Sequence, residues 1–362
     1  MSEYRQDPLS RRWIITGSDR AARPNEFLEP PITRQPGPCP FCAGNESETP
    51  DAVSTYVLNG GKNWLVRVVP NKYPAISTDQ SVDRATAPLS AGSGVGSAGI
   101  PGFGRHEVII ESPRHVASFT ELIPLEAEFV IRAYRDRLSQ LKAERRYAYV
   151  QIFKNVGPAA GASLEHVHSQ LLALPGVPEA IQQELTASGD YYRQSGVSLL
   201  GKLIADELAA GTRIVAETDR FVAFCPYASR FSYEVWVAPR RHEPCFEDVE
   251  DGQFGELSRL MQDVIGRIER TVGQPTYNYF LHTQPFDMPA AGHYHWHIEI
   301  IPRLSKVAGF EWSTGCFINP LASESAAEHL RAAVEAKDVP PGKNSEAASK
   351  MPMTVVDPFP LP

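Results

Sequence analysis

The segment EVIIESPRHVASF (residues 107–119) recurs as EVWVAPRRHEPCF (residues 234–246), with Glu, Val, His and Phe at the same places. The two copies are 127 residues apart, the difference between 234 and 107. The same spacing relates further pairs of identical residues: Phe153 and Phe280, His166 and His293, His168 and His295, and Pro175 and Pro302. A constant spacing over so long a stretch predicts that the chain is a tandem duplication of one structural unit.

Each copy shows the same order of predicted elements. An apolar, strand-like run ends at a histidine, and an amphipathic helical stretch follows at residues 125–145 or 252–272. A second strand-like run, at residues 147–155 or 277–283, leads through a glycine-containing loop to a strand with alternating histidines. Strands interleaved with one long helix indicate an α+β fold built on antiparallel sheets. We expect the two units to join edge to edge, because that would cover strand edges that are otherwise exposed.

The composition is that of an ordinary globular protein of 362 residues, 42% hydrophobic and 22% charged. Its net charge of −8 argues against a general nucleic-acid binder, since such proteins carry a basic surface. No apolar stretch approaches the length of a membrane span, and the first residues contain no apolar signal region. Five cysteines, two of them in a C-x-x-C, favour a reducing compartment and a metal over disulfides. We therefore expect a cytoplasmic protein with neither nucleic-acid nor membrane partners.

Two segments are predicted to be poorly ordered. Residues 78–105 are rich in Gly, Ser and Ala, which is typical of a flexible loop. The tail, residues 339–362, has no hydrophobic period and several prolines, which predicts disorder. The chain then divides into an N-terminal half, residues 1–180, with a nucleophile and a zinc site. A C-terminal half, residues 181–338, would hold a second metal site and sugar-phosphate contacts.

The stretch GASLEHVHSQLL (residues 161–172) places polar side chains at alternate positions before an apolar run. His166, His168 and Gln170 therefore share one face of a predicted strand. Such groups can be hydrogen-bonded core residues, but alternating histidines in both copies favour a function. A neutral imidazole with a fixed tautomer is a good nucleophile, and Gln170 can donate to a phosphoryl oxygen but cannot activate water. The pattern favours transfer of a group to a second phosphate through His168 over hydrolysis.

A zinc site is predicted around GPCPFCAGNE, residues 37–46. Cys39 and Cys42 in a C-x-x-C can hold two corners of a tetrahedral zinc. The chain has no second C-x-x-C, so the other ligands must come from elsewhere, and His115 and His166 are the economical candidates. The alternatives are a redox pair, which lacks a thioredoxin-like context here, or two unrelated thiols.

The second half contains histidines that can form another metal site. His282, His295 and His297 would supply three ligands, with Glu184 or His242 completing the set. Imidazole with carboxylate suits iron and zinc. The alternative is that these histidines are vestiges of the duplicated strand, hydrogen-bonded in the core.

Other polar residues are candidates for substrate contacts. Arg20 and Arg23 can clamp a phosphate, although exposed arginines are usually only solvated. Asn155 and Ser163 belong to a glycine-rich segment that suits phosphate oxygens. Asn71 can read the edge of a base, or it can simply form a turn after a strand.

These residues belong to motifs that run in order through roughly residues 4–335: YRQDPLSRRWIITGSDRAARP, CPFCAGNE, VRVVPNKYPA, HEVIIESPRH, IFKNVGPAAGASLEHVHSQ, FSYEVWVAPRRH and HYHWHIEIIPR. Together they resemble the galactose-1-phosphate uridylyltransferase family, a branch of the histidine-triad superfamily. The resemblance implies two tandem histidine-triad-like units, each an antiparallel sheet with helices, joined in one chain.

The resemblance also implies a role for each candidate residue. His168 would accept a nucleotidyl group covalently, and Gln170 would stabilise the transferred phosphoryl group. The implied zinc ligands are Cys39, Cys42, His115 and His166. The implied ligands of a second metal, iron in some members, are Glu184, His282, His295 and His297. Contacts to phosphate, nucleotide or sugar are implied for Arg20, Arg23, Asn71, Asn155, Ser163, Phe310 and Glu311.

The implied reaction is a ping-pong exchange in a homodimer, in which UDP-glucose leaves glucose 1-phosphate and galactose 1-phosphate then collects the uridylyl group. Two segments of the sequence point to different branches of this family. TGCFIN (residues 314–319) is more similar to relatives that use ADP-glucose and phosphate, whereas GVSLLGKL (residues 196–203) replaces an additional C-x-x-C of those relatives. The alternatives are therefore an ADP-glucose phosphorylase-like enzyme or a hydrolase of nucleoside diphosphate sugars. A protein of another class, a non-catalytic zinc-bearing nucleotide binder, is the remaining alternative.

Overall fold

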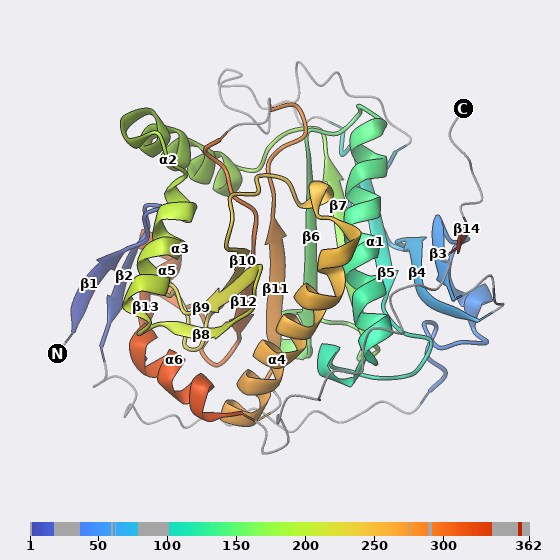
Figure 1. The fold of residues 1–362 in the computed structure, drawn as a ribbon. Helices are drawn as coiled ribbons and strands as arrows, with labels where there is room; N and C mark the ends of the chain where they lie inside the picture. Colours follow the sequence, from blue (N-terminus) through green and yellow to red (C-terminus); the bar gives the residue numbers. More distant parts are fainter. Residues whose placement is uncertain are drawn as a thin grey trace.

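The computed structural model describes residues 2–17, 37–58, 61, 63–78, 101–273, 275–288, 292–334 and 354–356. An eleven-stranded sheet, antiparallel at every pairing, forms the centre of the molecule (Figure 1). In spatial order its strands are β14 (Thr354–Val356), β3 (Ser54–Val57), β4 (Trp64–Pro70), β5 (Arg105–Ile110), β7 (His168–Leu174), β6 (Tyr149–Val156), β11 (Tyr277–His282), β12 (His297–Pro302), β10 (Val235–Pro239), β9 (Phe221–Phe224) and β8 (Ile214–Glu217). The predicted α+β fold with a large antiparallel sheet is confirmed.

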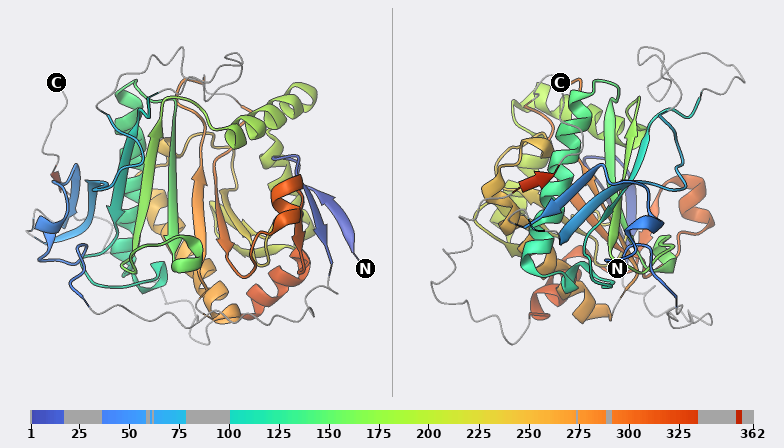
Figure 2. Two further views of the ribbon diagram at one scale, coloured as in Figure 1. Left: turned by 180° about the vertical axis from the view of Figure 1, so that it is seen from behind. Right: turned by 90° about the vertical axis from the view of Figure 1, so that its right-hand side faces the viewer.

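Two long helices cover one face of this sheet. They are α1 (Pro124–Ala143) and α4 (Phe254–Val272), and they pack against each other across the middle strands (Figure 1). The apolar faces of both helices join one buried core with the helix-facing side chains of the strands. Seen from behind, in Figure 2, the middle strands are in view and α1 and α4 lie on their far side. The remaining helices lie nearer the β8 end: α2 (Glu179–Ser195), α3 (Leu199–Ala210), α5 (Gly309–Thr314) and α6 (Ser323–Ala332).

The two copies of the repeat meet at the pair β6 and β11. Phe153 pairs directly with Phe280 in antiparallel register, and these residues are equivalent in the sequence repeat. When equivalent residues pair with each other, a local two-fold axis passes between them. The predicted edge-to-edge junction is therefore present, and it turns two small sheets into one.

Side chains of the middle strands alternate between the helix-covered face and the open face. Tyr279 on β11 and Leu171 on β7 belong to the core beneath the helices. On the open face, Gln170 pairs with Phe153, Phe153 with Phe280, and Phe280 with Glu299. This cross-strand row connects the strand of the predicted nucleophile with the second half of the chain.

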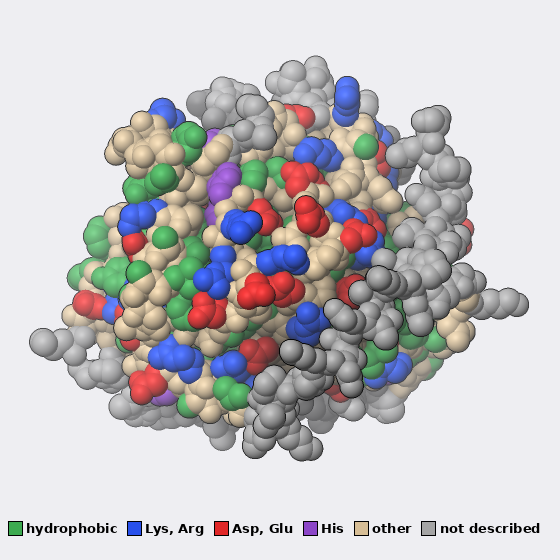
Figure 3. Space-filling model, in the orientation of Figure 1, with side chains coloured by type: hydrophobic (Ala, Val, Ile, Leu, Met, Phe, Trp, Pro, Cys, Tyr) green, Lys and Arg blue, Asp and Glu red, His purple; other side chains and the backbone are tan. Residues whose placement is uncertain are grey.

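The outer side of the helices is strongly charged. Figure 3 shows Lys or Arg and Asp or Glu side chains interspersed over this face. Ion pairs on it include Arg135 with Asp251 at 2.8 Å and Lys142 with Glu247 at 2.8 Å. Interspersed charges of both signs are typical of a solvated surface.

A second, three-stranded sheet packs beside α3 and consists of β1 (Glu3–Gln6), β2 (Trp13–Thr16) and β13 (Phe317–Asn319). Its β2–β13 pairing is parallel, which differs from the purely antiparallel sheets that we expected. A parallel pair is possible because β2 and β13 come from opposite ends of the chain and need no tight turn between them.

The segments predicted to be poorly ordered lie mainly outside the described residues, which exclude 79–100 and most of the tail. Within the tail, Thr354–Val356 instead forms strand β14, which pairs with β3. Among the described residues, no helix is both long and apolar enough to span a membrane.

Candidate active site

The strand β7 begins at His168, and the loop before it is held in place by close packing. Gly157, directly after β6, has φ 78°, and a Cβ there would lie 2.3 Å from Cγ2 of Thr276. Only glycine fits this backbone conformation and this approach. The loop continues to His166, whose side chain is fully buried, and then enters β7.

His168 is held as a neutral imidazole with a free ring nitrogen. Its Nδ1 lies 2.7 Å from the backbone carbonyl oxygen of His166, so Nδ1 carries the proton and donates it. Nε2 therefore keeps its lone pair. Burial, and to a smaller degree the charge of Lys154, lowers the pKa of His168 to about 4. An unprotonated Nε2 on a fixed ring is what a histidine nucleophile requires.

Groups on both sides hold this strand and ring in position. Beneath it, the buried Lys154 on β6 donates to the carbonyl oxygen of His168 at 3.1 Å and forms an ion pair with Glu111. On the open side, the ring of Phe41 packs edge-on against His168, with centroids 5.3 Å apart. Neither Lys154 nor Phe41 stands out in the sequence, since a buried lysine and a loop aromatic look like ordinary core residues.

Gln170 follows two residues later on the same face and is partly exposed. Its Oε1 lies 2.9 Å from Nε2 of His106, at the start of the neighbouring strand β5. His106 was not predicted as a site residue, because it directly precedes the repeated segment and has no histidine at the equivalent place in the second copy.

The predicted zinc ligands converge. One ligand atom each from Cys39, Cys42, His115 and His166 lies within 4.8 Å of the others. Nδ1 of His166 is 3.5 Å from Sγ of Cys39 and 3.6 Å from Sγ of Cys42. Nε2 of His166 donates to the carbonyl oxygen of Ser112 at 2.8 Å, which fixes the tautomer with Nδ1 free to bind a metal. Two thiols and two imidazoles suit tetrahedral zinc.

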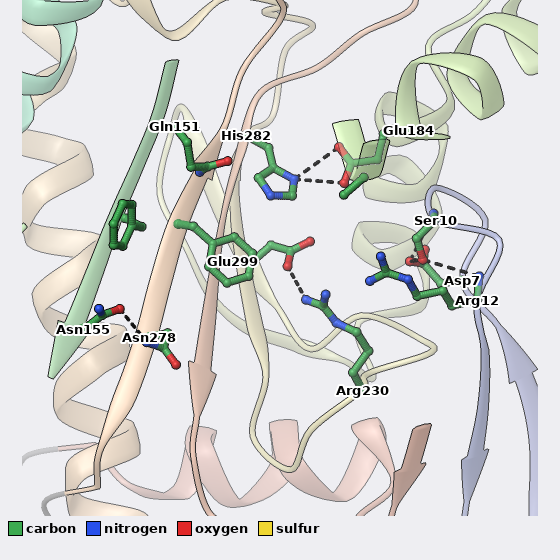
Figure 4. Close-up of a pocket in the computed structure, with 13 residues that line it drawn as sticks. Asp7, Ser10, Arg12, Gln151, Asn155, Glu184, Arg230, Asn278, His282 and Glu299 are labelled. Atoms are coloured by element: carbon green, nitrogen blue, oxygen red, sulfur yellow. Dashed lines mark hydrogen bonds and ion pairs between the residues drawn. The ribbon is translucent and has the colours of Figure 1, made fainter. Parts of the chain in front are cut away.

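A second group of possible metal ligands lies in the C-terminal half. It consists of Glu184, His282, His297 and Glu299, again with one ligand atom each within 4.8 Å of the others. Nδ1 of His282 is 2.9 Å from Oε1 of Glu184, and Figure 4 shows these two side chains facing each other. Glu299 points instead toward Arg230, with which it forms an ion pair. Nε2 of His297 is buried, makes no hydrogen bond among the described residues and lies 3.5 Å from Oε1 of Glu299, so a cation between them would bind both side chains.

The charges in this group are strongly coupled. Burial acts to raise the pKa of Glu184, but the charge and hydrogen bond of His282, together with the charge of His297, outweigh it and the pKa is lowered. Burial acts to lower the pKa of His282, and Glu184 reverses that effect. Burial opposes ionisation of Glu299, yet Arg230 holds its pKa well below the usual range. Two carboxylates and two imidazoles suit a divalent transition metal such as iron or zinc.

Comparison with known proteins agrees with these arrangements. Residues 1–178 match the N-terminal domain of galactose-1-phosphate uridyl transferase, and residues 103–339 match a domain of unknown function, DUF4921. ADP-glucose phosphorylase of Arabidopsis thaliana is 35% identical over 334 residues, covering 91% of this chain and 92% of that protein. The chain belongs to the galactose-1-phosphate uridylyltransferase family. It is thereby one of the nucleotidyltransferases of the histidine-triad superfamily.

Two further relatives place the chain within this family. The galactose-1-phosphate uridylyltransferase of Thermotoga maritima is 26% identical, covering 91% of this chain and 98% of that protein. The crystal structure of the Arabidopsis thaliana ADP-glucose phosphorylase with bound ADP-glucose superposes with a TM-score of 0.78 at 33% identity. That match covers 91% of this chain and 99% of the other.

The family resemblance implied His295 as a ligand of the second metal, but the structure puts Glu299 in that group and leaves His295 out. The hydrogen bonds explain why. Nε2 of His295, like Nε2 of His166, donates to a backbone carbonyl at the end of a neighbouring strand. His297, like His168, directs Nδ1 at the carbonyl of the histidine two residues before it. His295 is therefore the structural counterpart of the zinc-group His166, and the repeat has shifted by two residues at this strand.

The surroundings of His295 extend this correspondence. Its ring lies edge-on to His242 with centroids 5.6 Å apart, compared with 5.3 Å between His115 and His166. Gly201, where a Cβ would be 3.7 Å from Nδ1 of His295, stands three residues after Ser198. The second half thus repeats the two imidazoles of the zinc group, while the segment facing them lacks cysteines. His242, an alternative second-metal ligand in the sequence, lies here and not with Glu184.

A cavity of about 430 Å³ opens on the same sheet face as the nucleophile, toward the C-terminal half (Figure 4). Three members of the second metal group border it, and the turn after β1 closes it with Asp7, Ser10 and Arg12. Asn155 also lines the cavity and accepts a hydrogen bond from Asn278 at 2.8 Å. Of the predicted substrate residues that the structure describes, only Asn155 lines this cavity.

The other predicted substrate residues are spread more widely. Asn71 lies at the end of β4, beside His106, and Ser163 is exposed in the loop before β7. Phe310 and Glu311 are on α5, which contacts β13 of the three-stranded sheet, whereas β7 belongs to the eleven-stranded sheet. Arg20 and Arg23 lie outside the described residues.

Proposed function

We propose that this chain transfers a nucleoside monophosphate from a nucleotide sugar to a second phosphate through a covalent nucleotidyl-histidine on His168. The observation that supports this most directly is the buried, neutral ring whose Nε2 lone pair is free. Nε2 attacks the α-phosphorus, the bond from that phosphorus to the bridging oxygen breaks, and the sugar 1-phosphate leaves. An oxygen of the second phosphate then attacks the same phosphorus and breaks the N–P bond.

We infer ADP-glucose as the donor and inorganic phosphate as the acceptor, so that the products are glucose 1-phosphate and ADP. This assignment rests on similarity: the ADP-glucose phosphorylase is 35% identical, whereas the Thermotoga maritima uridylyltransferase is 26% identical. The TGCFIN sequence at residues 314–319 points the same way.

Uridylyl transfer from UDP-glucose to galactose 1-phosphate is the second candidate. The absence of cysteines in residues 196–203 favours it, since the ADP-glucose-using relatives carry a C-x-x-C there. Both candidates use the same nucleophile and differ in the base and in the acceptor.

Gln170 would contribute through its amide N–H groups, which can donate to a phosphoryl oxygen as charge develops on it. A neutral amide does not deprotonate water, which favours a phosphate acceptor over hydrolysis. Zinc in the Cys39, Cys42, His115 and His166 group would hold the loop that carries Phe41 against His168. The chemistry that zinc supplies in such a closed site is structural.

Phe310 and Glu311 are on α5, at the β8 end of the molecule and not beside β7 (Figure 1). As predicted sugar contacts, they would reach a substrate on His168 across a contact between two chains. We therefore propose that the enzyme works as a homodimer, in which α5 of one copy reaches the site of the other.

The test is to incubate the purified protein with ADP-glucose or UDP-glucose and measure its intact mass. We expect a nucleotidyl adduct that is absent in His168→Ala and present in the control His329→Ala, which removes an exposed histidine on α6. Phosphate, galactose 1-phosphate or water is then added to see which one discharges the adduct. Substantial exchange by His168→Ala, or tight binding of both nucleotide sugars without an adduct, would overturn the proposal.

A further inference from the structure

His106 is in contact with Gln170 and is itself tightly held. Its backbone carbonyl accepts the N–H of Asn71 at 2.8 Å, and its Nδ1 accepts the N–H of Ala75 at 3.1 Å. Its Nε2 lies 2.9 Å from Oε1 of Gln170. The segment after β4 therefore wraps around this one imidazole and fixes the orientation of its ring.

The hydrogen bonds determine which ring nitrogen carries the proton. A backbone N–H is always a donor, so Nδ1 of His106 must be the unprotonated nitrogen that accepts from Ala75. A neutral imidazole has one proton, which must then be on Nε2. His106 therefore faces Gln170 with an N–H group.

Two amide groups lie near this N–H, and only one of them can accept it. Oδ1 of Asn71 already accepts the N–H of Tyr73 at 2.8 Å, so Asn71 presents its NH₂ group, 3.1 Å from Nε2. An NH₂ group is a donor and cannot take the proton. The acceptor is Oε1 of Gln170, and this contact also decides which way round the Gln170 amide lies.

We propose that His106 is a positioning residue for the transfer reaction, holding Oε1 of Gln170 so that its NH₂ group faces the transferring phosphoryl group. Among the described residues, Nε2 of Gln170 makes no hydrogen bond, so both of its protons are available to a ligand on the open face. An unheld glutamine amide can turn over and present its oxygen, which would repel a phosphoryl oxygen. The proposal rests on the proposed function, in which Gln170 donates to that group.

The proposed contact between His106 and Gln170 predicts a specific kinetic effect. The same phosphorus is attacked in both half-reactions, and the same oxygens gain charge in both. Loss of the His106 contact should therefore slow formation and discharge of the adduct by a similar factor. It should leave the affinity for the nucleotide sugar nearly unchanged, because Gln170 acts on charge that develops in the transition state.

The experiment measures single-turnover rate constants for adduct formation and discharge, together with the Kd for the nucleotide sugar. For His106→Leu, which removes the N–H, we expect both rate constants to fall about tenfold, less than the loss of a whole donor costs. His106→Gln places an amide N–H near the position of Nε2 and should recover most of the rate. In a Gln170→Leu background, His106→Leu should cause no further loss, since the residue acts only through Gln170.

His329→Ala, which changes an exposed histidine, serves as the matched control. Its two rate constants and its Kd for the nucleotide sugar should equal those of the wild-type protein. Wild-type rate constants in His106→Leu, or the same tenfold loss in the Gln170→Leu background, would overturn the positioning role alone. If the wild-type protein forms no adduct with either nucleotide sugar, the proposed function fails and the role of His106 fails with it.

Discussion

The strand β7, which carries the proposed nucleophile, differs from its copy β12 at Gln170. Gln170 and Glu299 are structural equivalents, since Gln170 pairs with Phe153 and Glu299 pairs with the equivalent Phe280. Arg230 keeps Glu299 ionised, and an ionised carboxylate has no proton to donate and repels phosphoryl oxygens. His297 thus occupies the position equivalent to His168, the proposed nucleophile, but beside a group that opposes phosphoryl transfer. The two copies of this strand therefore differ in chemistry: β7 suits phosphoryl transfer, and β12 suits binding of a cation.

The ionisation of His168 gives a testable pH dependence. Because burial lowers its pKa to about 4, the ring stays neutral as the pH falls from 8 to 5.5. A histidine at its ordinary pKa would be roughly nine-tenths protonated at pH 5.5, and its reaction would slow about tenfold. We therefore expect the single-turnover rate of adduct formation to stay constant over this range.

The measurement uses the first half-reaction because a phosphate acceptor titrates near neutral pH and would obscure the result. Circular dichroism at each pH serves as the control for folding. A rate constant that halves near pH 6.5 would show that His168 titrates like an exposed histidine.

At the scale of elements, the short Cys39–Cys42 loop carries two of the four members of the zinc group, Cys39 and Cys42, together with Phe41. Phe41 packs against His166 at 5.9 Å and His168 at 5.3 Å between ring centroids. A cation that binds the loop to β7 therefore also fixes the aromatic contact to the nucleophile. A metal in this group would therefore act on the proposed reaction by holding the loop in place.

Cys42→Ser tests this element. We expect the variant to lose bound zinc and about 3 kcal/mol of stability, which corresponds to a decrease in Tm of roughly 5 °C. Zinc content is measured by mass spectrometry of the metal, and Tm is measured with and without a chelator. Chelation should lower the Tm of the wild-type protein but not that of the variant.

Cys316→Ser is the matched control, because Cys316 lies outside both metal groups. It should retain zinc and respond to the chelator as the wild-type protein does. A wild-type protein without zinc, or a Cys42→Ser variant with full zinc content, would contradict the prediction.

The sequence predicted elements well wherever a local pattern repeats. The two amphipathic stretches became α1 and α4, and the alternating histidines became the starts of β7 and β12. It placed all four members of the zinc group, because a C-x-x-C and two repeated histidines carry their own signals. It did not find Glu299, which continues the alternation of β12 by one further step but looks like an ordinary strand residue.

The missed residues depend on contacts between distant segments. His106 contacts Gln170 only because β5 and β7 pair in one particular register. The sequence of neither strand alone determines that register. The two-residue shift that moves His295 out of the second metal group arises in the loop before β12. A constant spacing in the sequence cannot show such a shift.

At the scale of the whole molecule, the two halves share one sheet and one core. Beneath the nucleophile strand, the hydroxyl groups of Tyr134 on α1 and Tyr279 on β11 are 2.6 Å apart. The Tyr134 hydroxyl also lies 2.9 Å from Oγ of Ser169 and 3.1 Å from Oε1 of Glu111, a carboxylate oxygen that can only accept. This buried network joins the two copies of the repeat, so we expect neither half to unfold before the other.

Tyr279→Phe tests this coupling by removing one hydroxyl from the network. We expect the free energy of unfolding to fall by about 1 kcal/mol, the usual net value of a buried hydrogen bond. We expect the opening free energies of both halves to fall by this same amount. Hydrogen–deuterium exchange in increasing urea gives an opening free energy for peptides of β7 and, separately, of β12. Tyr233→Phe is the matched control, because its hydroxyl meets His329 at the surface, where loss of a hydrogen bond costs little, so the opening free energies of both sets of peptides should stay near the wild-type values. If β12 peptides opened at a lower free energy than β7 peptides, the halves would be independent domains, and the central β6–β11 pairing would be a contact between them and not part of a common core.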